Sequence, residues 1–244
     1  MNVFIQGAGR GLGLAIAKEA KAAGATHLFL TARNPENSTG YSVLPPSQNV
    51  TWLTVDFTDT TSIERAGSDV CNHVDHLSYL ICTAGVLRDD QTMPEKRIND
   101  LDLASMLHSY QTNAAGPILM TKALWPTLKG THPVKVASLS ARVGSITDNR
   151  LGGWYSYRAS KAAQNQLMHT MAIELARANK LSSVAMLHPG TVDTDLSRPF
   201  HKNVPAGKLF TTDHSAACLW QVVNNLTPAD SGGFFAYDGS SIPF

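Results

Sequence analysis

The stretch FIQGAGRGLGLAIAKEAKAAG at residues 4–24 passes from a short apolar run through closely spaced glycines into an amphipathic pattern that predicts a helix. Backbone N–H groups at the start of such a helix have no partner within it, so they can receive a phosphate group. The glycines are Gly7, Gly11 and Gly13, and Leu12 stands where the G-x-G-x-x-G fingerprint has glycine. No lysine of a nucleoside-triphosphatase loop follows. The stretch predicts a dinucleotide-binding turn, with a purely structural turn as the alternative.

Short apolar runs alternate with longer helix-like segments along the chain, which is the pattern of β-α-β units in a parallel sheet. Right-handed crossovers place helices on both faces of such a sheet. We therefore predict a single α/β domain over residues 1–244, with a Rossmann-like, doubly wound parallel sheet. The expected strands are 2–6, 26–31, 50–55, 77–82, 133–139, 182–188 and 233–236. The expected helices are 11–23, 60–72 (capped by Asp59 or Thr60), 101–129, 154–178 and 212–225 (capped by Thr212 or Asp213).

Two irregular segments interrupt this pattern. Residues 34–49 are polar and contain prolines, which predicts a surface loop. Residues 193–211 contain Pro199, Pro205 and Gly207 and follow a strand end, where open parallel sheets bind ligands. We expect this second segment to be a substrate lid.

The composition limits the possible classes of function. Lys and Arg number 20 against 19 Asp and Glu, so no global field attracts nucleic acid or an anionic membrane. The 3 cysteines form no C-x-x-C and indicate reduced thiols. The apolar run at the N-terminus is too short for a signal peptide or a membrane span. We expect a cytoplasmic protein that binds neither nucleic acid nor membranes.

The nucleotide preference is predicted at the end of the second strand, FLTARN, which in a dinucleotide-binding sheet reads the adenosine ribose. An acidic residue there would bind the 2′-hydroxyl of NAD, whereas Arg33 can pair with the 2′-phosphate of NADP. Arg10 can add a second positive charge, so we predict NADP, although either arginine can also be merely solvated. Asp56 either accepts from the adenine amino group or serves the cap of the following helix.

The stretch WYSYRASK at residues 154–161 offers two tyrosines and one lysine. On a helix, residues four apart share a face, so Lys161 lies beside Tyr157 rather than Tyr155. A neighbouring ammonium favours the phenolate, which predicts a lowered pKa for Tyr157 and proton transfer at neutral pH. The alternative is an ordinary half-buried tyrosine and a solvated lysine.

Six short motifs, in this order, resemble those of the short-chain dehydrogenase/reductase family. They are the glycine loop, CTAG at 82–85, QTNAAGP around Asn113, VASLSARVGS at the fifth strand, YRASK at 157–161 and HPGTVDT at 188–194. Within the family, SARVGSI, GGWYSYRASKAA and the tail GGFFAYDGSSIPF are most similar to the C-factor and sniffer group of carbonyl-reductase-like proteins.

The resemblance implies a reaction in which a hydride from NADPH reduces a carbonyl carbon. Tyr157 would donate the proton to the growing alkoxide. Lys161 would lower the pKa of that tyrosine and hold the nicotinamide ribose, and Asn113 would hold a water that links Lys161 to solvent. Taken alone, Asn113 is better explained by a break or kink in the long 101–129 helix.

The fifth strand departs from the family pattern Ser-Ser-x-x-Gly. Counting back from Gly144, the position of the catalytic serine is Ala141, and Ser140 precedes it. Because side chains alternate along a strand, a shift of one residue turns the hydroxyl away. We predict that Ser140 reaches the site through an irregular strand end. The alternatives are Ser138, Ser145 or no serine at all.

The residues and the resemblance together predict a cofactor site along the strand ends, and because no His/carboxylate cluster is spaced for a metal, we expect that site to be metal-free. Its residues are Gly7, Arg10, Gly11, Leu12, Gly13, Arg33, Asp56, Phe57, Ala84, Gly85, Tyr157, Lys161, Pro189, Gly190, Val192 and Thr194. The inserted TDNRLGGW would shape the pocket through Asp148, Asn149 or Trp154.

Two classes of function follow. The first is an NADPH-dependent reductase of a ketone or aldehyde, a small-molecule carbonyl substrate. The second is an NADP-binding signalling or regulatory protein with little turnover, for which Ala141 and the C-factor resemblance speak. The resemblance further implies a homodimer or homotetramer formed through helices 101–129 and 154–178.

Overall fold

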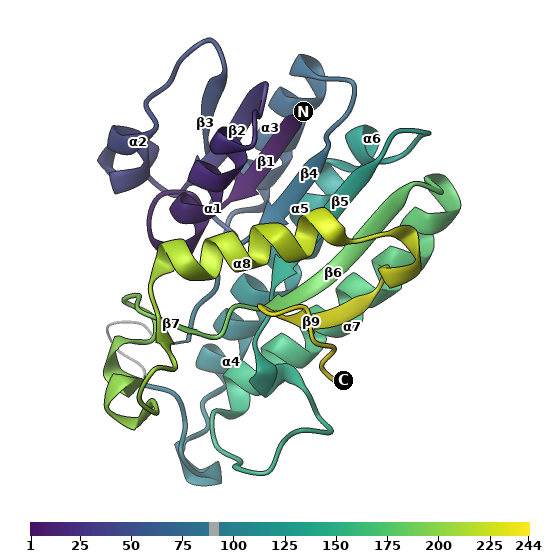
Figure 1. Ribbon diagram of the computed structural model, residues 1–244. Coiled ribbons are helices and arrows are strands. Elements are labelled where there is room, and N and C mark those ends of the chain that lie inside the picture. Colours follow the sequence, from purple (N-terminus) through teal and green to yellow (C-terminus); the bar gives the residue numbers. More distant parts are fainter. Residues whose placement is uncertain (88–92) are drawn as a thin grey trace.

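The computed structural model describes residues 1–87 and 93–244. Within these residues, seven parallel strands form one sheet in the order β3-β2-β1-β4-β5-β6-β9 (Figure 1). The strands are β1 Asn2–Gln6, β2 His27–Ala32, β3 Val50–Thr54, β4 Tyr79–Cys82, β5 Val134–Leu139, β6 Ser182–His188 and β9 Gly233–Ala236. The order reverses between β1 and β4, and open sheets bind ligands at such a point, beyond the carboxyl ends of the strands.

Helices cover both faces of the sheet. α1 and α8 pack side by side on one face, whereas α3, α5 and α7 line the other (Figure 1). The bounds are α1 Gly11–Ala22, α2 Thr39–Val43, α3 Thr60–His73, α4 Leu103–Tyr110, α5 Gly116–Ala123, α6 Trp125–Leu128, α7 Tyr155–Ala178 and α8 Thr212–Asn225. None of these helices is long and apolar enough to cross a membrane.

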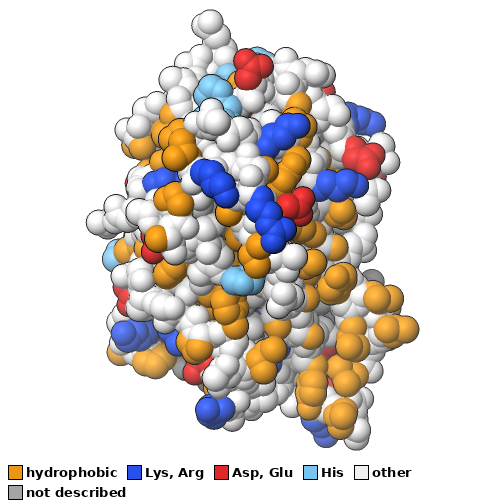
Figure 2. Space-filling view, turned by 90° about the vertical axis from the view of Figure 1, so that its right-hand side faces the viewer, with side chains coloured by type: hydrophobic (Ala, Val, Ile, Leu, Met, Phe, Trp, Pro, Cys, Tyr) orange, Lys and Arg blue, Asp and Glu red, His pale blue; other side chains and the backbone are white. Residues whose placement is uncertain are grey.

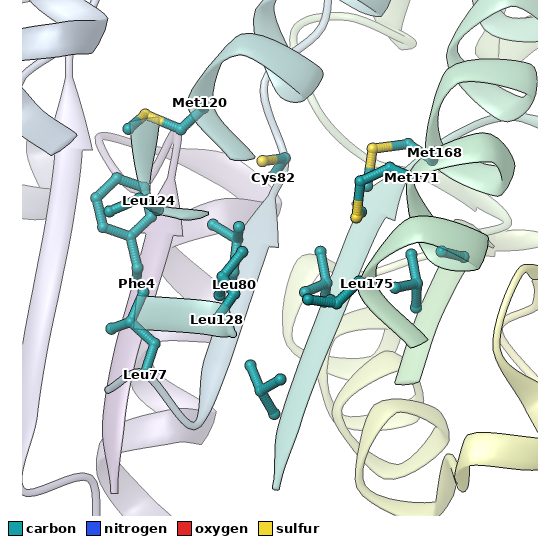
Figure 3. Packing of buried hydrophobic residues seen from close by; sticks show 14 of the residues in the cluster. Phe4, Leu77, Leu80, Cys82, Met120, Leu124, Leu128, Met168, Met171 and Leu175 are labelled. Atoms are coloured by element: carbon teal, nitrogen blue, oxygen red, sulfur yellow. The ribbon is translucent and has the colours of Figure 1, made fainter. Parts of the chain in front are cut away.

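The core consists of two layers separated by the sheet. Alternation along β1 sends Phe4 to one layer and Val3 and Ile5 to the other, and all three are fully buried. Figure 3 shows the layer of Phe4, in which Phe4 of β1 lies beside Met120 and Leu124, while Met168, Met171 and Leu175 of α7 cover another part of the same layer. Because both faces are covered, apolar side chains on both faces of the central strands are buried, as for Val3, Phe4 and Ile5 of β1. The predicted fold class and the seven strands are confirmed.

The prediction of one helix over 101–129 is wrong. The segment holds α4, a π-helical turn at Gln111–Ala115, α5 and the short α6. Pro117 lacks the N–H that an α-helix would need there, and π-helical turns of this kind are frequent at functional sites. The turn carries Asn113, which is fully buried.

Two further expectations need correction. Thr211, rather than Thr212 or Asp213, caps α8, because its hydroxyl accepts from the N–H of His214 at 3.2 Å. Residues 34–49 are more than a surface loop, since they form α2 and pack on the glycine loop, where the Gly40 N–H donates to the Gly9 carbonyl at 2.7 Å. The predicted cap of α3 by Asp59 is confirmed.

The segment 193–211 is closed at its base by two short strands. β7 Thr191–Val192 pairs in parallel with β8 Leu209–Phe210, and a 3₁₀ helix at Arg198–Asn203 lies between them. This excursion emerges from the carboxyl end of β6 and contacts Arg10 and Gly11 at the start of α1. Its position suits a lid, although the covering of a substrate stays a prediction.

Candidate active site

The glycine loop has the geometry of an anion-binding turn. Gly7 and Gly11 adopt φ values of 87° and 56°, which favour glycine. A Cβ on Gly13 would stand 2.2 Å from the Gly7 carbonyl oxygen, so only glycine fits there. The start of α1 has no side-chain cap and no acidic residue in its first turn. Its first N–H groups can therefore donate to a phosphate, and the residues fit a dinucleotide.

The two arginines predicted to bind the 2′-phosphate differ in their contacts. Arg33, just after β2, is exposed and makes no ion pair with another described residue. Arg10 pairs instead with Asp195, at 2.8 Å, in the segment 193–211. The expected second charge for a 2′-phosphate is thus engaged by a carboxylate. Figure 2 shows that basic and acidic side chains are also interleaved on the upper part of one face.

Asp56 follows β3 and does not cap α3. Its carboxylate accepts from the Thr58 N–H at 2.8 Å and the Thr58 hydroxyl at 2.7 Å. Burial raises the pKa of Asp56, but these hydrogen bonds and the charge of Arg33 outweigh it and leave the pKa below its ordinary value. Asp56 is therefore ionised at neutral pH.

Asn113 joins the π-helical turn to the end of β4. Its side-chain amide donates to the Val86 carbonyl at 2.8 Å and accepts from the Val86 N–H at 2.7 Å. It also donates to the Ser160 hydroxyl at 3.0 Å on α7. A Cβ on Gly85 would stand 3.2 Å from Asn113 Oδ1 and 3.4 Å from Lys161 Nζ. The structure thus brings Gly85, Asn113 and Lys161 together. The π-helical turn that carries Asn113 is therefore part of the candidate site.

Tyr157 and Lys161 lie one turn apart on the buried face of α7. The Lys161 ammonium is 5.8 Å from the centroid of the Tyr157 ring. Tyr157 is 8% exposed whereas Tyr155 is 40% exposed. The prediction that Lys161 lies beside Tyr157 rather than Tyr155 is therefore confirmed. Lys161 Nζ donates to the Leu139 carbonyl at 2.8 Å and to Gln164 Oε1 at 2.9 Å.

The predicted direction of the Tyr157 pKa is wrong for this structure. Burial raises the pKa of the phenol above its ordinary value, because the phenolate loses its hydration. Burial also lowers the pKa of Lys161 to about 7, so the lysine carries only part of a charge at neutral pH. Desolvation therefore outweighs the attraction on which the sequence argument relied.

The serines at the end of β5 point toward α7. Ser140 Oγ donates to Asn165 Oδ1 at 2.6 Å, and Ser138 Oγ accepts from Gln164 Nε2. The sheet ladder continues through Ser140, whose N–H donates to the Leu187 carbonyl at 2.8 Å. The strand end is regular up to that residue, so the predicted irregular strand end is wrong.

Ser145 Oγ accepts from the Asp148 N–H at 3.1 Å, in the loop after β5. Each of the three candidate hydroxyls is therefore buried and bonded within the protein. Which of them bonds a substrate stays a prediction.

Aromatic rings from the segment 193–211 and from the loop before α7 contact each other beside Tyr157. Phe200 lies with its ring centroid 4.8 Å from that of Trp154, and Trp154 lies 6.3 Å from Tyr157 in an edge-on arrangement. Thr194 Cγ2 would be 3.7 Å from a Cβ on Gly11, which places the segment after β6 against the glycine loop. These ring contacts place Trp154 beside Tyr157, and its role as a pocket wall stays a prediction.

Two polar residues of the site, Glu95 and Gln164, are not predicted from the sequence. Glu95 is buried, and its carboxylate accepts from the N–H of Ser156 at 3.3 Å and from the hydroxyl of Ser156. It thereby caps the start of α7 from another segment and lines a cavity of about 30 Å³ beside Tyr157. Gln164 is fully buried next to Lys161. Neither belongs to a motif, and only the contacts of the folded chain reveal them.

Comparisons with a family model and with known sequences find relatives of this chain. Residues 1–205 match the family model described as short chain dehydrogenase. An uncharacterized oxidoreductase of Schizosaccharomyces pombe is 32% identical, over 99% of this chain and 97% of its own. The C-signal protein of Myxococcus xanthus is 35% identical, over 60% of this chain and 83% of its own.

Solved structures of carbonyl reductases have the same fold over the full length. The carbonyl reductase Sniffer of D. melanogaster superposes with a TM-score of 0.87 and 26% identity, covering 100% of this chain and 99% of its own. The NADPH-bound carbonyl reductase from chicken fatty liver gives a TM-score of 0.85 and 26% identity, covering 100% and 98%. The predicted resemblance to the C-factor and sniffer group is confirmed.

Proposed function

The chain belongs to the short chain dehydrogenase family of oxidoreductases, and from this premise we propose that it reduces a ketone or aldehyde to an alcohol with NADPH. The observation that carries the proposal is the pair of Tyr157 and Lys161, one helical turn apart, with the ammonium 5.8 Å from the phenol ring. Asn113 and Gly85 lie against this pair at the end of β4.

Tyr157 would act as the acid of the reaction. Its raised pKa keeps the phenol protonated at neutral pH, which is the state that a proton donor to a growing alkoxide requires. Burial also excludes water, so a hydrogen bond from the phenol to the substrate oxygen is worth more than in solution. When bound, NADPH supplies the hydride.

Lys161 and Asn113 would support this proton transfer. The protonated form of Lys161 favours the phenolate that remains after Tyr157 has given up its proton. Asn113 holds the Val86 backbone through two hydrogen bonds, which keeps the end of β4 close to Lys161. Ser140 is our proposal for the hydroxyl that bonds the substrate oxygen, and this requires its hydrogen bond to Asn165 to be exchanged.

The uncapped start of α1 can receive the pyrophosphate that NADPH and NADH share. The choice of NADPH is supported by the exposed Arg33, which can receive the 2′-phosphate. The chicken carbonyl reductase, which superposes on this chain, is bound to NADPH.

A regulatory role is the second candidate function. The similarity to the C-signal protein favours it, as does the engagement of Ser138 and Ser140 by α7 side chains. Such a protein would bind NADP without appreciable turnover.

The test is a fluorescence titration with NADPH and with NADH, followed by absorbance of the reduced nicotinamide on adding aldehydes, ketones and quinones. Preferential NADPH binding with substrate-dependent oxidation supports the reductase. Tight binding without oxidation across the panel favours the regulatory protein, and failure to bind either nucleotide contradicts both.

We also propose that the protein is a homodimer or homotetramer through α4 and α7. No residue of α4 is buried, and its apolar positions recur at helical spacing on the exposed surface. Leu103 is 69% exposed and Leu107 is 59% exposed. A second copy of the chain would cover this stripe.

A further inference from the structure

Gln164 is a fully buried amide on α7, one turn beyond Lys161. Its Oε1 accepts from Lys161 Nζ at 2.9 Å. Its Nε2 donates to the Leu139 carbonyl at 3.3 Å and to Ser138 Oγ. We propose that Gln164, held by Ser138, is a positioning residue that orients the Lys161 ammonium toward Tyr157. The inference rests on the proposed reductase function and adds a residue to its machinery.

The hydrogen-bond partners determine which way the amide points. Lys161 Nζ can only donate, so the amide atom next to it has to be the oxygen. The Leu139 carbonyl can only accept, so the atom next to it has to be the nitrogen. Both requirements are met by the same orientation, and the opposite one would leave two buried groups facing like partners. The Lys161 ammonium and the Leu139 carbonyl therefore fix the orientation of the Gln164 amide.

This arrangement restrains a side chain that is otherwise flexible. Lys161 has a four-carbon stem with many rotamers, and its ammonium has three donors. Two of them are used by the Leu139 carbonyl and Gln164 Oε1, which leaves the third for another acceptor. Because Leu139 ends β5, the lysine is tied to the same strand end as Ser138. Sheet and helix together hold the ammonium.

Gln164 also acts on the charge of the lysine. An amide oxygen stabilises an ammonium more than a neutral amine, so it opposes the effect of burial, which lowers the pKa of Lys161 to about 7. The elements packed against α7 carry other charged or titratable groups, none of which hydrogen-bonds to Lys161: His108, Tyr110, Lys122, Arg142 and His188. Among the described residues, Gln164 is the side chain that hydrogen-bonds to Lys161, so we expect it to modulate this charge.

The alternative is that Gln164 only fills space. Gln164→Met separates the two roles, because methionine has a similar length without hydrogen-bonding groups. Gln164→Glu places a negative charge at the same atom. Gln166→Met is the matched control, since Gln166 lies on the exposed face of α7 and donates to Thr170 at 3.2 Å.

The direct test is a titration of Lys161 by ¹³Cε NMR in the protein without nucleotide, with Lys161→Met to assign the signal. We expect Gln164→Met to lower the midpoint by roughly one pH unit and Gln164→Glu to raise it, with Gln166→Met unchanged. An unchanged midpoint in a folded Gln164→Met protein overturns the proposal. If that variant does not fold, Ser138→Ala has to lower the midpoint in the same direction, and no shift there overturns it equally.

Kinetics give a second readout that a packing role would not move. The pH above which reduction declines should fall in Gln164→Met and rise in Gln164→Glu, with kcat in the former reduced by about tenfold. A uniform loss of rate at all pH values contradicts the positioning role. Because the NMR titration needs no turnover, an inactive carbonyl panel would refute the proposed function without deciding the role of Gln164.

Discussion

Arg10 in the glycine loop and Asp195 in the segment after β7 form an ion pair of 2.8 Å across 185 positions of sequence. The two side chains are 72% and 50% exposed, so the pair contributes little to stability and weakens with salt. The ion pair links the proposed lid to the glycine loop, at which the nucleotide would bind. Arg198 also pairs with Asp195, at 2.8 Å.

Asp195→Asn should therefore release Arg10 for the 2′-phosphate. We expect NADPH affinity at low salt to rise by about two- to fivefold relative to NADH, with thermal stability nearly unchanged. Fluorescence titration measures both affinities. Asp213→Asn is the control, since it removes an exposed ion pair between α8 and Lys18 of α1 without touching the loop. A drop in NADPH affinity would contradict the release of Arg10.

Arg33→Ala should lower NADPH affinity by about tenfold or more and leave NADH affinity unchanged, because a charge-assisted hydrogen bond to phosphate would be lost. Arg177→Ala on the exposed side of α7 controls for the change in net charge. The ratio of the two affinities is the decisive quantity. If the ratio stays at the wild-type value, Arg33 does not select the nucleotide.

Lys161→Met should stabilise the protein while abolishing turnover. Lys161 has a folded pKa of about 7 against about 10.5 in the unfolded chain, so the unfolded state binds more protons between these values. The burial cost is fully present below pH 7 and disappears as pH rises toward the unfolded value. We expect a gain on the order of a few kcal/mol at pH 6 that fades by about pH 10.

Urea unfolding of wild type and Lys161→Met across this range measures the effect. Lys122→Met, at an exposed position of α5, should show no such pH dependence. A destabilised Lys161→Met protein at pH 6 would mean that the hydrogen bonds of the ammonium outweigh its desolvation.

Leu107→Glu should dissociate the proposed oligomer, because a carboxylate in an apolar interface loses its hydration without a partner. Sedimentation or light scattering gives the mass, and circular dichroism verifies the fold. Leu151→Glu is the control, since Leu151 is 93% exposed in the loop before α7. A wild-type protein that is monomeric at all concentrations would remove the basis of this prediction.

The fold follows from local patterns, whereas parts of the site do not. Strands such as β6 and helices such as α3 are marked by apolar runs, periodicity and caps, and they lie within a residue or two of the predicted bounds. The π-helical turn at Gln111–Ala115 has no such mark, because apolar spacing continues through it. It depends on the contact of Asn113 with Val86, which is made only in the folded chain.

Long-range partners also explain the missed residues. Glu95 is 61 positions from Ser156, and Gln164 is 26 from Ser138, so neither contact has a signature in the sequence. The lowered pKa predicted for Tyr157 is wrong for a related reason. Spacing revealed the neighbouring lysine, but only the structure reveals how completely the pair is buried.

The central claim is that Tyr157 donates the proton, and Tyr157→Phe beside Tyr155→Phe tests it most directly. Each variant is titrated with NADPH and then assayed with whichever carbonyl compound the wild type reduces. We predict that Tyr157→Phe binds NADPH normally and loses turnover by about a hundredfold or more, while the exposed Tyr155→Phe keeps it. Reduction by Tyr157→Phe at the wild-type rate would contradict the mechanism.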